Sequence, residues 1–400
     1  MTGAQAGESR RPSVVHVIPD KMGGALTIVA NLLAYRHPDA FEHRLVLTHN
    51  RLHVDTRSTL PIAADATVVL EYSLPVENLA SVLRRLAVAV GAGPGVLVCH
   101  DHLELLLAAS HRLDRAVVHV LHGDYDYYYN LAVDHEPYVH AFVAYSRTVY
   151  EQLRVRLPHR TADIFWLPYG IPMTDDRRTA SPGPLRAVFA GRLDEAKGIF
   201  DLPAIDRLLL ARGNRIRWTI LGDGPARESL QSRFPPSDDV RYRVVDTPAA
   251  ARAIVAGHDV FVLPSRGEGL SVATVEAMCA GVVPIVSDLP SMAELADNDT
   301  TGFRVALGDL NAFADAIARL DNDRPRLETM SAAAMSFARR RYDIATRAGA
   351  YQALFAQASE LQHRRPPAPS RAVGSRLDRP WIPNTLVRFV RTAIRHSRRS

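Results

Sequence analysis

The chain has 400 residues, of which 47% are hydrophobic and 23% charged, which excludes a low-complexity or fibrous protein. This length exceeds one hydrophobic core, so two α/β domains are expected. The only cysteines, Cys99 and Cys279, lack disulfide or CxxC spacing, which fits a reducing compartment. The net charge of +5 is uneven, because residues 363–400 hold ten arginines and one acid, leaving −4 for the rest.

No targeting or membrane-spanning segment is evident in the sequence. The first residues, MTGAQAGESRRPS, lack the apolar core of a signal peptide. The longest apolar run, LAVAVGAGPGVLVC from Leu86, is short and interrupted by glycines and a proline, so it cannot cross a bilayer. We therefore expect a cytoplasmic protein, with any membrane contact peripheral at the inner face of the cell membrane.

The first 172 residues alternate short apolar strands with helical stretches. This alternation predicts a parallel, Rossmann-like sheet with covering helices. The expected strands are VVHVI from Val14, RLVLT from Arg44, GVLVCH from Gly95, AVVHVLHG from Ala116 and AFVAYS from Ala141.

A polar segment with Pro and Gly at residues 173–184 predicts a linker, and a second α/β series follows over 185–341. Its expected strands are LRAVFAG, IRWTILGDG, VRYRVV, DVFVLPS and VVPIVS. Residues 342–362 predict a C-terminal helix that returns to the first domain. Residues 363–400 predict an Arg-rich linker followed by an amphipathic helix.

The stretch AGRLDEAKGIFDL places two cations on the loop after a strand. The strand ends at Gly191 and a helix is expected near Gly198, which leaves Arg192 and Lys197 on the connection. Ligands of open α/β sheets collect at the carboxyl ends of strands, and two cations beside helix amides suit a pyrophosphate. The alternative is a solvated loop in which one of the chain's two lysines occurs by chance.

The stretch PSRGEGLSVATVEAMCAG carries two glutamates around the start of a helix. Glu268 follows a strand, and Glu276 lies eight residues later within the helix. Carboxylates accept hydrogen bonds from vicinal hydroxyls of a ribose or hexose, and the amides of Gly269, Leu270 and Ser271 open the helix toward a phosphate. Without this context such glutamates are more often capping or surface residues.

These motifs carry a resemblance to a known family. GRLDEAKG, ILGDGPARESL, DVFVLPSRGEGLSVATVEAMCAGVVPIVS and GFRVALGDLNAFADAI, in this order, resemble retaining glycosyltransferases of family 4. The resemblance implies a GT-B fold of two facing Rossmann-like domains with a deep interdomain cleft. It also implies that Arg192 and Lys197 hold the donor diphosphate, Glu276 the ribose, and Glu268 the transferred sugar.

The first half resembles the family more loosely. PDKMGGALTIVANLL is similar to its Gly-rich loop, in which Gly23 and Gly24 let the backbone approach diphosphate and acceptor, with Lys21 nearby. His122 ends a strand where the family commonly has an active-site histidine. A plain turn and a structural histidine are the alternatives, and DYDYYYN from Asp124 either walls the acceptor pocket or packs on its own domain.

The C-terminal tail predicts an amphipathic helix with arginines opposite its apolar residues. With Trp381 ahead of it, residues 381–399 resemble a helix lying on an anionic membrane surface. The alternatives are a helix docked on the protein's own body and a disordered tail that touches nucleic acid nonspecifically. A membrane contact suits a lipid-linked acceptor, and no specific nucleic-acid partner is expected.

Together these features predict an enzyme that moves a hexose-type sugar from a UDP- or GDP-sugar to a hydroxyl of a carbohydrate or lipid-linked acceptor. The resemblance implies that the anomeric configuration is retained and that no metal or other cofactor is required. Together with the tail, it makes surface polysaccharide or glycolipid biosynthesis the expected setting. The rival hypotheses are a nucleotide-sugar 2-epimerase of the same fold and a non-catalytic, membrane-recruited scaffold.

Overall fold

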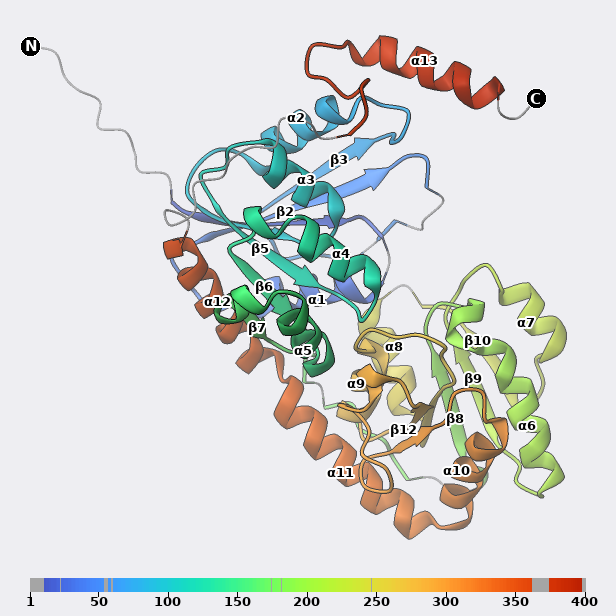
Figure 1. Cartoon of the computed structure of the whole chain (residues 1–400). Helices are drawn as coiled ribbons and strands as arrows, with labels where there is room; N and C mark the ends of the chain where they lie inside the picture. The colour runs from blue at the N-terminus through green and yellow to red at the C-terminus, as the bar shows by residue number, and fades with distance from the viewer. Residues whose placement is uncertain are drawn as a thin grey trace, which may run out of the picture. The chain divides into compact units, whose positions relative to one another are not determined.

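A computed structural model describes residues 11–21, 23–53, 57–58, 60–173, 175–180, 182–245, 247–361 and 374–397. The chain divides into two compact units, drawn together in Figure 1. Unit 1 comprises Met1–Tyr145, Val149–Leu167 and Ala348–Ser400, and unit 2 comprises Ser146–Thr148 and Pro168–Arg347. The chain passes from unit 1 to unit 2 after Leu167, before the boundary expected at residue 172. It returns to unit 1 after Arg347, within the helix Ile344–Leu361.

Unit 1 is built on a seven-stranded sheet with the order β3-β2-β1-β4-β5-β6-β7, in which every neighbouring pair is parallel. Its central strands are almost completely buried, as expected for a parallel sheet covered on both faces. The strands are β1 (Ser13–Pro19), β2 (Glu42–Asn50), β3 (Ala66–Tyr72), β4 (Gly95–Cys99), β5 (Ala116–Leu121), β6 (Ala141–Ala144) and β7 (Ile164–Trp166).

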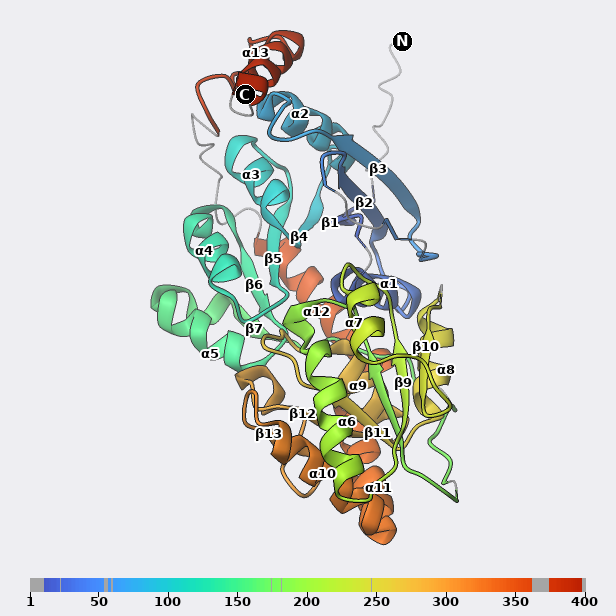
Figure 2. The same ribbon diagram turned by 90° about the vertical axis from the view of Figure 1, so that its right-hand side faces the viewer.

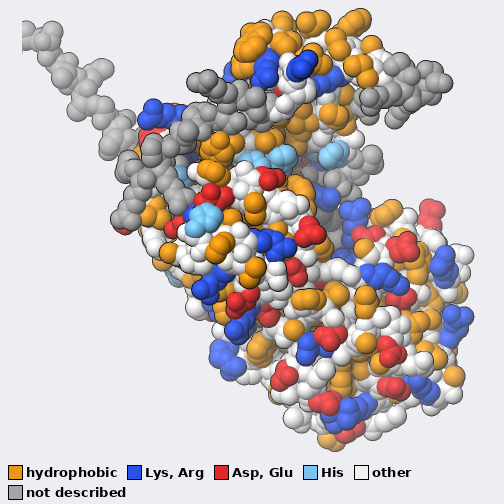
Figure 3. Space-filling model, viewed as in Figure 1, with side chains coloured by type: hydrophobic (Ala, Val, Ile, Leu, Met, Phe, Trp, Pro, Cys, Tyr) orange, Lys and Arg blue, Asp and Glu red, His pale blue; other side chains and the backbone are white. Residues whose placement is uncertain are grey.

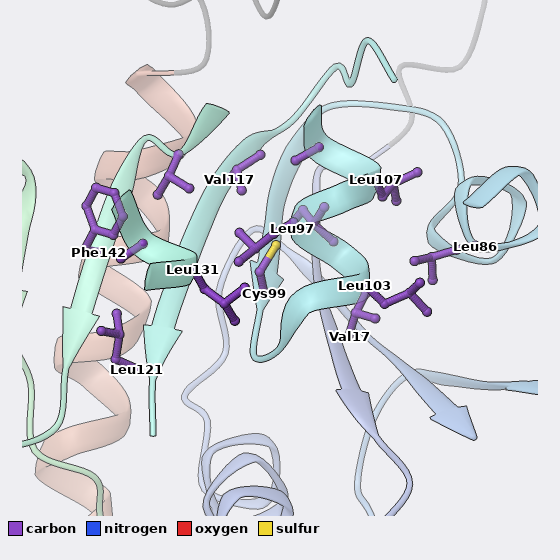
Figure 4. Close-up of a cluster of buried hydrophobic side chains, with 14 of the residues drawn as sticks. Val17, Leu86, Leu97, Cys99, Leu103, Leu107, Val117, Leu121, Leu131 and Phe142 are labelled. Atoms are coloured by element: carbon purple, nitrogen blue, oxygen red, sulfur yellow. The ribbon is translucent and has the colours of Figure 1, made fainter. Parts of the chain in front are cut away.

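Helices cover both faces of the unit 1 sheet (Figure 2). One core cluster joins the sheet to α2, α3, α4 and α5, with the free thiol of Cys99 among its leucines and valines (Figure 4). On the other face α1 packs against β1 and β2, and Phe355 of α12 contacts His16. The helices are α1 (Gly24–Ala34), α2 (Leu79–Val90), α3 (His102–Ser110), α4 (Asp126–Asp134), α5 (Arg147–Arg156), α12 (Ile344–Leu361) and α13 (Asn384–Ser397).

Unit 2 has a six-stranded parallel sheet with the order β10-β9-β8-β11-β12-β13. The strands are β8 (Arg186–Ala190), β9 (Arg217–Leu221), β10 (Val240–Arg243), β11 (Val260–Leu263), β12 (Val283–Ser287) and β13 (Phe303–Val305). The helices are α6 (Leu202–Ala211), α7 (Arg227–Arg233), α8 (Pro248–Ala256), α9 (Val272–Cys279), α10 (Leu310–Asn322) and α11 (Arg324–Tyr342).

Every strand expected from the sequence is present, so the prediction of two parallel α/β sheets is confirmed. The strands that the sequence did not predict, β3, β7 and β13, all lie at sheet edges. β7 and β13 have three residues each, too few for a periodic pattern, and β3 is partly exposed, so it lacks the continuous apolar run of a central strand. Val69 of β3, for example, is 47% exposed.

The C-terminal helix α13 packs on unit 1 beside α2 through polar contacts. The Asp378 carboxylate accepts from the Leu79 backbone N–H at 2.7 Å and from Arg391 Nη2 at 2.7 Å. Arg388 Nη2 donates to Glu77 Oε1 at 2.5 Å. In the structure, the helix is docked on the protein's own body, which was one of the alternatives. Two of the tail arginines, Arg388 and Arg391, form ion pairs with carboxylates of unit 1.

On the side away from these contacts, α13 and the residues before it expose apolar side chains. Trp381 is 77% exposed, Phe389 73% and Leu386 51%, whereas Val387 is fully buried. Figure 3 shows hydrophobic side chains gathered over the segment labelled α13 in Figure 1. Among the described residues, no helix is both long and apolar enough to cross a membrane.

Candidate active site

In unit 2, the loop after β8 is shaped by two residues with special backbone roles. The Asp194 side chain accepts from the Lys197 backbone N–H at 3.2 Å and caps a short 3-10 turn, Glu195–Lys197. Gly198 then adopts φ +68°, and a Cβ there would lie 1.9 Å from the Pro264 carbonyl oxygen. A second 3-10 turn follows, so α6 begins at Leu202 and not near Gly198 as the sequence indicated.

This loop holds Lys197 against Glu268 of the loop after β11. Lys197 Nζ donates to both carboxylate oxygens of Glu268, at 2.7 and 2.8 Å. Glu268 is 9% exposed, whereas the Lys197 side chain is 28% exposed. Parallel strands place their carboxyl ends at the same edge of a sheet, which explains why residues 71 positions apart meet here.

Further hydrogen bonds fix the two loops to each other and to the next one. The Arg266 backbone N–H and the Ser265 hydroxyl both donate to the Ala196 carbonyl, at 2.8 and 3.1 Å. The Ser291 hydroxyl donates to the Glu268 carbonyl at 2.9 Å. The Lys197–Glu268 pair therefore lies on a rigid base even though both residues are in loops.

Arg192 lies on the same loop as Lys197 and remains accessible. Its side chain is 52% exposed, and its guanidinium lies 3.4 Å from the Asp194 carboxylate. An exposed pair of this kind holds a side chain weakly. Arg192 can thus leave Asp194 for a better anion without disrupting the fold.

Helix α9 begins where the sequence predicted, directly after the glycine-containing loop. The Ser271 hydroxyl accepts from the Thr274 N–H at 3.3 Å and caps the helix. The Leu270 carbonyl accepts from the Tyr169 hydroxyl at 3.2 Å, so the segment of Gly269, Leu270 and Ser271 has a defined backbone. The cap is a neutral hydroxyl, and the first turn of α9 has no acidic residue. The partial positive charge at the helix start is therefore not neutralised by the helix itself and suits an anion.

Glu276, within α9, is paired with a residue that the sequence analysis missed. Arg252 Nη1 donates to Glu276 Oε1 at 3.2 Å. Burial raises the pKa of Glu276, and Arg252 opposes that shift. Arg252 lies in the Ala-rich helix α8, where no motif distinguished it from a surface arginine.

Unit 1 has its own cavity, of about 470 Å³, at the carboxyl ends of β1, β4 and β5. Its wall includes Lys21, Gly23, Gly24 and His122, so four residues singled out from the sequence line one space. Gly23 precedes α1 and has nothing within 4 Å of a hypothetical Cβ, which leaves open room at the helix start. The remaining polar lining includes Asp20, Thr48, Asn50, His100, Asp101 and Tyr128.

His122 is the end of a row of three hydrogen-bonded imidazoles. His100 Nδ1 lies 2.8 Å from His122 Nε2, and His100 Nε2 lies 3.1 Å from His16 Nδ1. Burial lowers the pKa of His16 and of His122 to about 3 each and lowers that of His100 well below its usual range. The row is therefore neutral at physiological pH.

The tyrosines that follow His122 have different surroundings: one lines the cavity and two bond to residues of unit 1. Tyr128 lines the cavity with its ring centre 6.2 Å from that of His122. Tyr127 donates to Asp101, and the buried Tyr129 donates to Asp124 at 2.6 Å. Tyr128 therefore lines the unit 1 cavity, whereas Tyr127 and Tyr129 bond to residues of their own unit; the acceptor role of that cavity stays a prediction.

His100 and His102 point to different neighbours. His102 stacks edge-on against His135, with ring centres 5.5 Å apart, and does not join the imidazole row. Across the described ranges, no group of three or more His, Cys, Asp or Glu side chains is arranged to hold a metal ion.

Part of unit 2 is similar in sequence to a known family. Residues 184–323 match the family described as glycosyl transferases group 1. A GDP-mannose:cellobiosyl-diphosphopolyprenol alpha-mannosyltransferase of Xanthomonas oryzae is 32% identical over 173 residues, covering 41% of this chain and 44% of that protein. The putative colanic acid biosynthesis glycosyltransferase WcaL of Escherichia coli is 33% identical over 170 residues, covering 38% and 42%. The chain spans less than half the length of these relatives.

Structural comparison extends the likeness to both units. Anabaena HepE, in a crystal structure with UDP and glucose, superposes with a TM-score of 0.67 at 15% identity, covering 86% of this chain and 99% of that one. Sucrose-phosphate synthase of Thermosynechococcus elongatus also gives 0.67 at 15% identity, covering 87% and 99%. The fold is therefore that of GT-B glycosyltransferases, as the sequence predicted.

Proposed function

We propose that the protein transfers a hexose-type sugar from a UDP- or GDP-sugar to an acceptor hydroxyl, because residues 184–323 match the glycosyl transferases group 1. The observation that carries this proposal is the Lys197–Glu268 pair at the carboxyl edge of the unit 2 sheet. It places a cation suited to a diphosphate next to a carboxylate suited to sugar hydroxyls.

The proposed roles follow from where charge develops during transfer. As the glycosidic bond breaks, negative charge grows on the leaving diphosphate, and Lys197, Arg192 and the start of α9 stabilise it. The proposal gives this task to protein cations without a metal ion. Glu276 accepts hydrogen bonds from the ribose, and Glu268 from the transferred sugar.

We infer retention at the anomeric carbon. The bond from the anomeric carbon to the diphosphate breaks, the acceptor oxygen bonds to the same face of that carbon, and the acceptor proton passes to a donor phosphate oxygen. Both oxygens of Glu268 face Lys197, which suits a hydrogen-bond acceptor better than a nucleophile, so we propose no covalent intermediate on Glu268; retention itself is inferred from the family resemblance. The anomeric configuration of the product, read by NMR coupling constants, tests this step.

We propose a lipid-linked carbohydrate as the acceptor, in surface polysaccharide or glycolipid biosynthesis. The Xanthomonas relative is named for a cellobiosyl-diphosphopolyprenol acceptor. An Escherichia coli relative, 31% identical over 113 residues, is named for a diphosphoundecaprenol-linked acceptor. The unit 1 cavity, with Lys21 and the helix start at Gly23, offers a cation and the backbone amides of a helix start for an anionic, hydroxyl-bearing group.

Peripheral membrane contact through residues 381–399 is the second element of the proposal. Arg388 and Arg391 pair with unit 1, so insertion of Trp381, Leu386 and Phe389 dominates over arginine attraction to lipid headgroups.

Removing one inserted aromatic side chain weakens partitioning into the membrane by about tenfold or more. Phe389→Asp is expected to abolish co-sedimentation with phosphatidylglycerol-containing vesicles, whereas Val155→Asp, at a 75% exposed site on α5, leaves it unchanged. Equal binding of both variants contradicts this contact.

The transfer reaction is tested by nucleotide release from a panel of UDP- and GDP-sugars with a chelator present. Lys197→Ala is expected to lower release by about a hundredfold or more, because a preorganised charge on the leaving group is lost. Arg215→Ala removes an exposed arginine paired with Asp239 and serves as the matched control. Conversion of the donor to an epimer without acceptor supports the 2-epimerase instead, and absence of binding to every donor supports a non-catalytic scaffold.

A further inference from the structure

Unit 2 has a cavity of about 580 Å³ on one face of its sheet, over β9 and the edge strand β10. Its lining includes three arginines, Arg217 of β9 and Arg241 and Arg243 of β10. Arg241 pairs in register with Thr219 and Arg243 with Leu221, and residues two apart on a strand share a face. The register therefore places the three arginines on one face of two neighbouring strands.

This face of the sheet is the one on which α8 packs. Thr219 Oγ1 lies 2.8 Å from Nε2 of His258, which closely follows α8. The neighbouring Trp218 points to the other face, where its indole N–H donates to Asp206 of α6 at 2.8 Å. Helix α8 packs against β8, and the three arginines over β9 and β10 are exposed. The cavity is therefore accessible from solvent at the edge of the sheet.

The charges of these three arginines are not balanced within the cavity. In the part of the chain that the structure describes, none of the three forms a hydrogen bond, an ion pair or a ring contact. Of the two carboxylates in the lining, Asp239 is paired with Arg215 at 2.6 Å, and Asp238 forms no ion pair with any of the three. A fourth arginine of the lining, Arg186, already binds Asp259 through two hydrogen bonds of 2.9 Å. The cavity therefore keeps an excess of positive charge.

Such a cluster costs stability unless an anion occupies it. Elsewhere in unit 2 surface arginines lie beside carboxylates, as Arg212 does beside Asp315 and Arg319 beside Asp299, each at 3.0 Å. Like charges on neighbouring strands repel each other and destabilise a sheet. A bound anion removes that repulsion and accepts a charge-assisted hydrogen bond from each guanidinium that it reaches.

We propose that this cavity is a binding site for a small phosphate-bearing molecule, whose phosphate oxygens accept hydrogen bonds from Arg217, Arg241 and Arg243. A carboxylate has two oxygens and is satisfied by one guanidinium fork, whereas a phosphate or diphosphate offers oxygens to several. The volume of the cavity lies in the range that is typical of small-molecule sites.

The site is additional to the proposed transfer site. The described residues that line the cavity include none of Arg192, Lys197, Glu268 and Glu276, so the donor motifs have no part in it. Three arginines are also few for a nucleic acid, and the residues before 363 sum to a charge of −4, so the surrounding surface does not attract a long polyanion. A small anion needs only the local charge of the cavity.

Calorimetric titration of the full-length protein with inorganic pyrophosphate at low ionic strength tests the proposal. In the double variant Arg241→Gln with Arg243→Gln, the affinity of one pyrophosphate site should fall about tenfold or more, because two charged donors are lost. The matched control is Arg207→Gln with Arg340→Gln, which removes the same charge from exposed arginines of α6 and α11 that also lack a partner among the described residues. This control should bind pyrophosphate within about twofold of the wild type, because neither arginine lines the cavity.

Two further titrations define the ligand class and separate this site from the donor site. Malonate, with two carboxylates, should bind here about tenfold or more weakly than pyrophosphate. Lys197→Ala should leave this site unchanged even where it weakens pyrophosphate binding at the donor site, so the two proposals fail separately. If the β10 double variant does not fold by circular dichroism, Arg217→Gln replaces it with the same expected loss.

Four results would overturn the proposal. The first is the absence of any pyrophosphate site that survives Lys197→Ala, and the second is an equal loss of affinity in the β10 double variant and its control. The third is malonate binding as tight as that of pyrophosphate, which contradicts the phosphate class. The fourth is tighter binding of a single-stranded oligonucleotide than of pyrophosphate through the same arginines, which would make the ligand a nucleic acid.

Discussion

The two units present different chemistry at the carboxyl ends of their sheets. Unit 2 sets opposite charges side by side, Lys197 with Glu268 and Arg252 with Glu276. Unit 1 sets neutral imidazoles in a row that ends at His122. Charged pairs, one on loops and one between helices α8 and α9, suit recognition of a charged nucleotide, and buried neutral rings suit a hydroxyl, because a buried charge without a partner is costly.

The difference extends to the similarity with known proteins. The family match covers residues 184–323, which all lie in unit 2. A diphosphate and a ribose make the same demands whatever sugar and acceptor are used, so the residues that hold them recur in recognisable motifs. Unit 1, to which we assign the acceptor, carries only loose motifs. The four experiments below test how separate these two chemistries are.

The largest effect is expected for Glu268→Gln, which removes the charge facing Lys197. Turnover should fall by about a hundredfold, because the neutral amide neither orients the ammonium nor accepts two sugar hydroxyls. Glu195→Gln changes an exposed carboxylate in the Lys197 loop and should leave kcat/KM within twofold of the wild type. Similar losses in the two variants would mean that general loop charge, and not this ion pair, governs the reaction.

The second effect concerns the backbone that carries Lys197. Gly198→Ala should lower the free energy of unfolding by at least about 2 kcal/mol, because φ is positive and the new Cβ meets the Pro264 carbonyl. Gly213→Ala is the matched control, since φ is +85° there but nothing lies within 4 Å. Urea unfolding measures both. Equal losses would show that the close contact between the loops adds nothing to backbone strain.

A smaller effect is expected for Glu276→Gln. The amide keeps one acceptor oxygen but loses its charge-assisted bond to Arg252, so KM for the donor should rise about tenfold with a smaller change in kcat. Glu228→Gln, on the exposed side of α7, is the control. An unchanged KM would remove Glu276 from the nucleotide site and leave it a structural partner of Arg252.

The smallest effect tests the neutral character of unit 1. Burial, reinforced by Asp101, raises the pKa of Glu104 to about 8, while its Oε1 accepts from the His100 N–H at 2.6 Å. The folded protein therefore binds a proton that the unfolded chain releases near pH 4.5, so this contribution to stability is present at low pH and lost as pH rises toward 8. Between pH 5 and 8 the wild type should lose about 1 kcal/mol or more relative to Glu104→Gln.

Unfolding midpoints at the two pH values measure this difference. Asp126→Asn, whose side chain in the wild type is 88% exposed, is the control and should follow the wild type. A Glu104→Gln variant with the same pH dependence as the wild type would mean that Glu104 is ionised when folded, which contradicts a neutral interior beneath the histidine row.

The sequence by itself determined the two parallel sheets, the order of their central strands along the chain, the positions of Arg192, Lys197, Glu268 and His122 after strand ends, and the position of Glu276 within a helix. These features are local: apolar periodicity and strand-to-helix turns lie within a few residues of one another. The roles assigned to those residues in transfer stay predictions. The strand β3 was not predicted because its burial is partial, and β7 and β13 were not predicted because each has only three residues.

Only the tertiary structure decided which side chains meet. Arg252 joins Glu276 and His16 joins His100 across strands and helices that are distant in sequence, and neither partner has a motif of its own. The tertiary structure also decided the orientation of α13. The sequence predicted its helical periodicity, but not that Arg388 and Arg391 would pair with Glu77 and Asp378. Periodicity defines the faces of an element, whereas the choice of which face is buried depends on the charges that the rest of the fold brings opposite it.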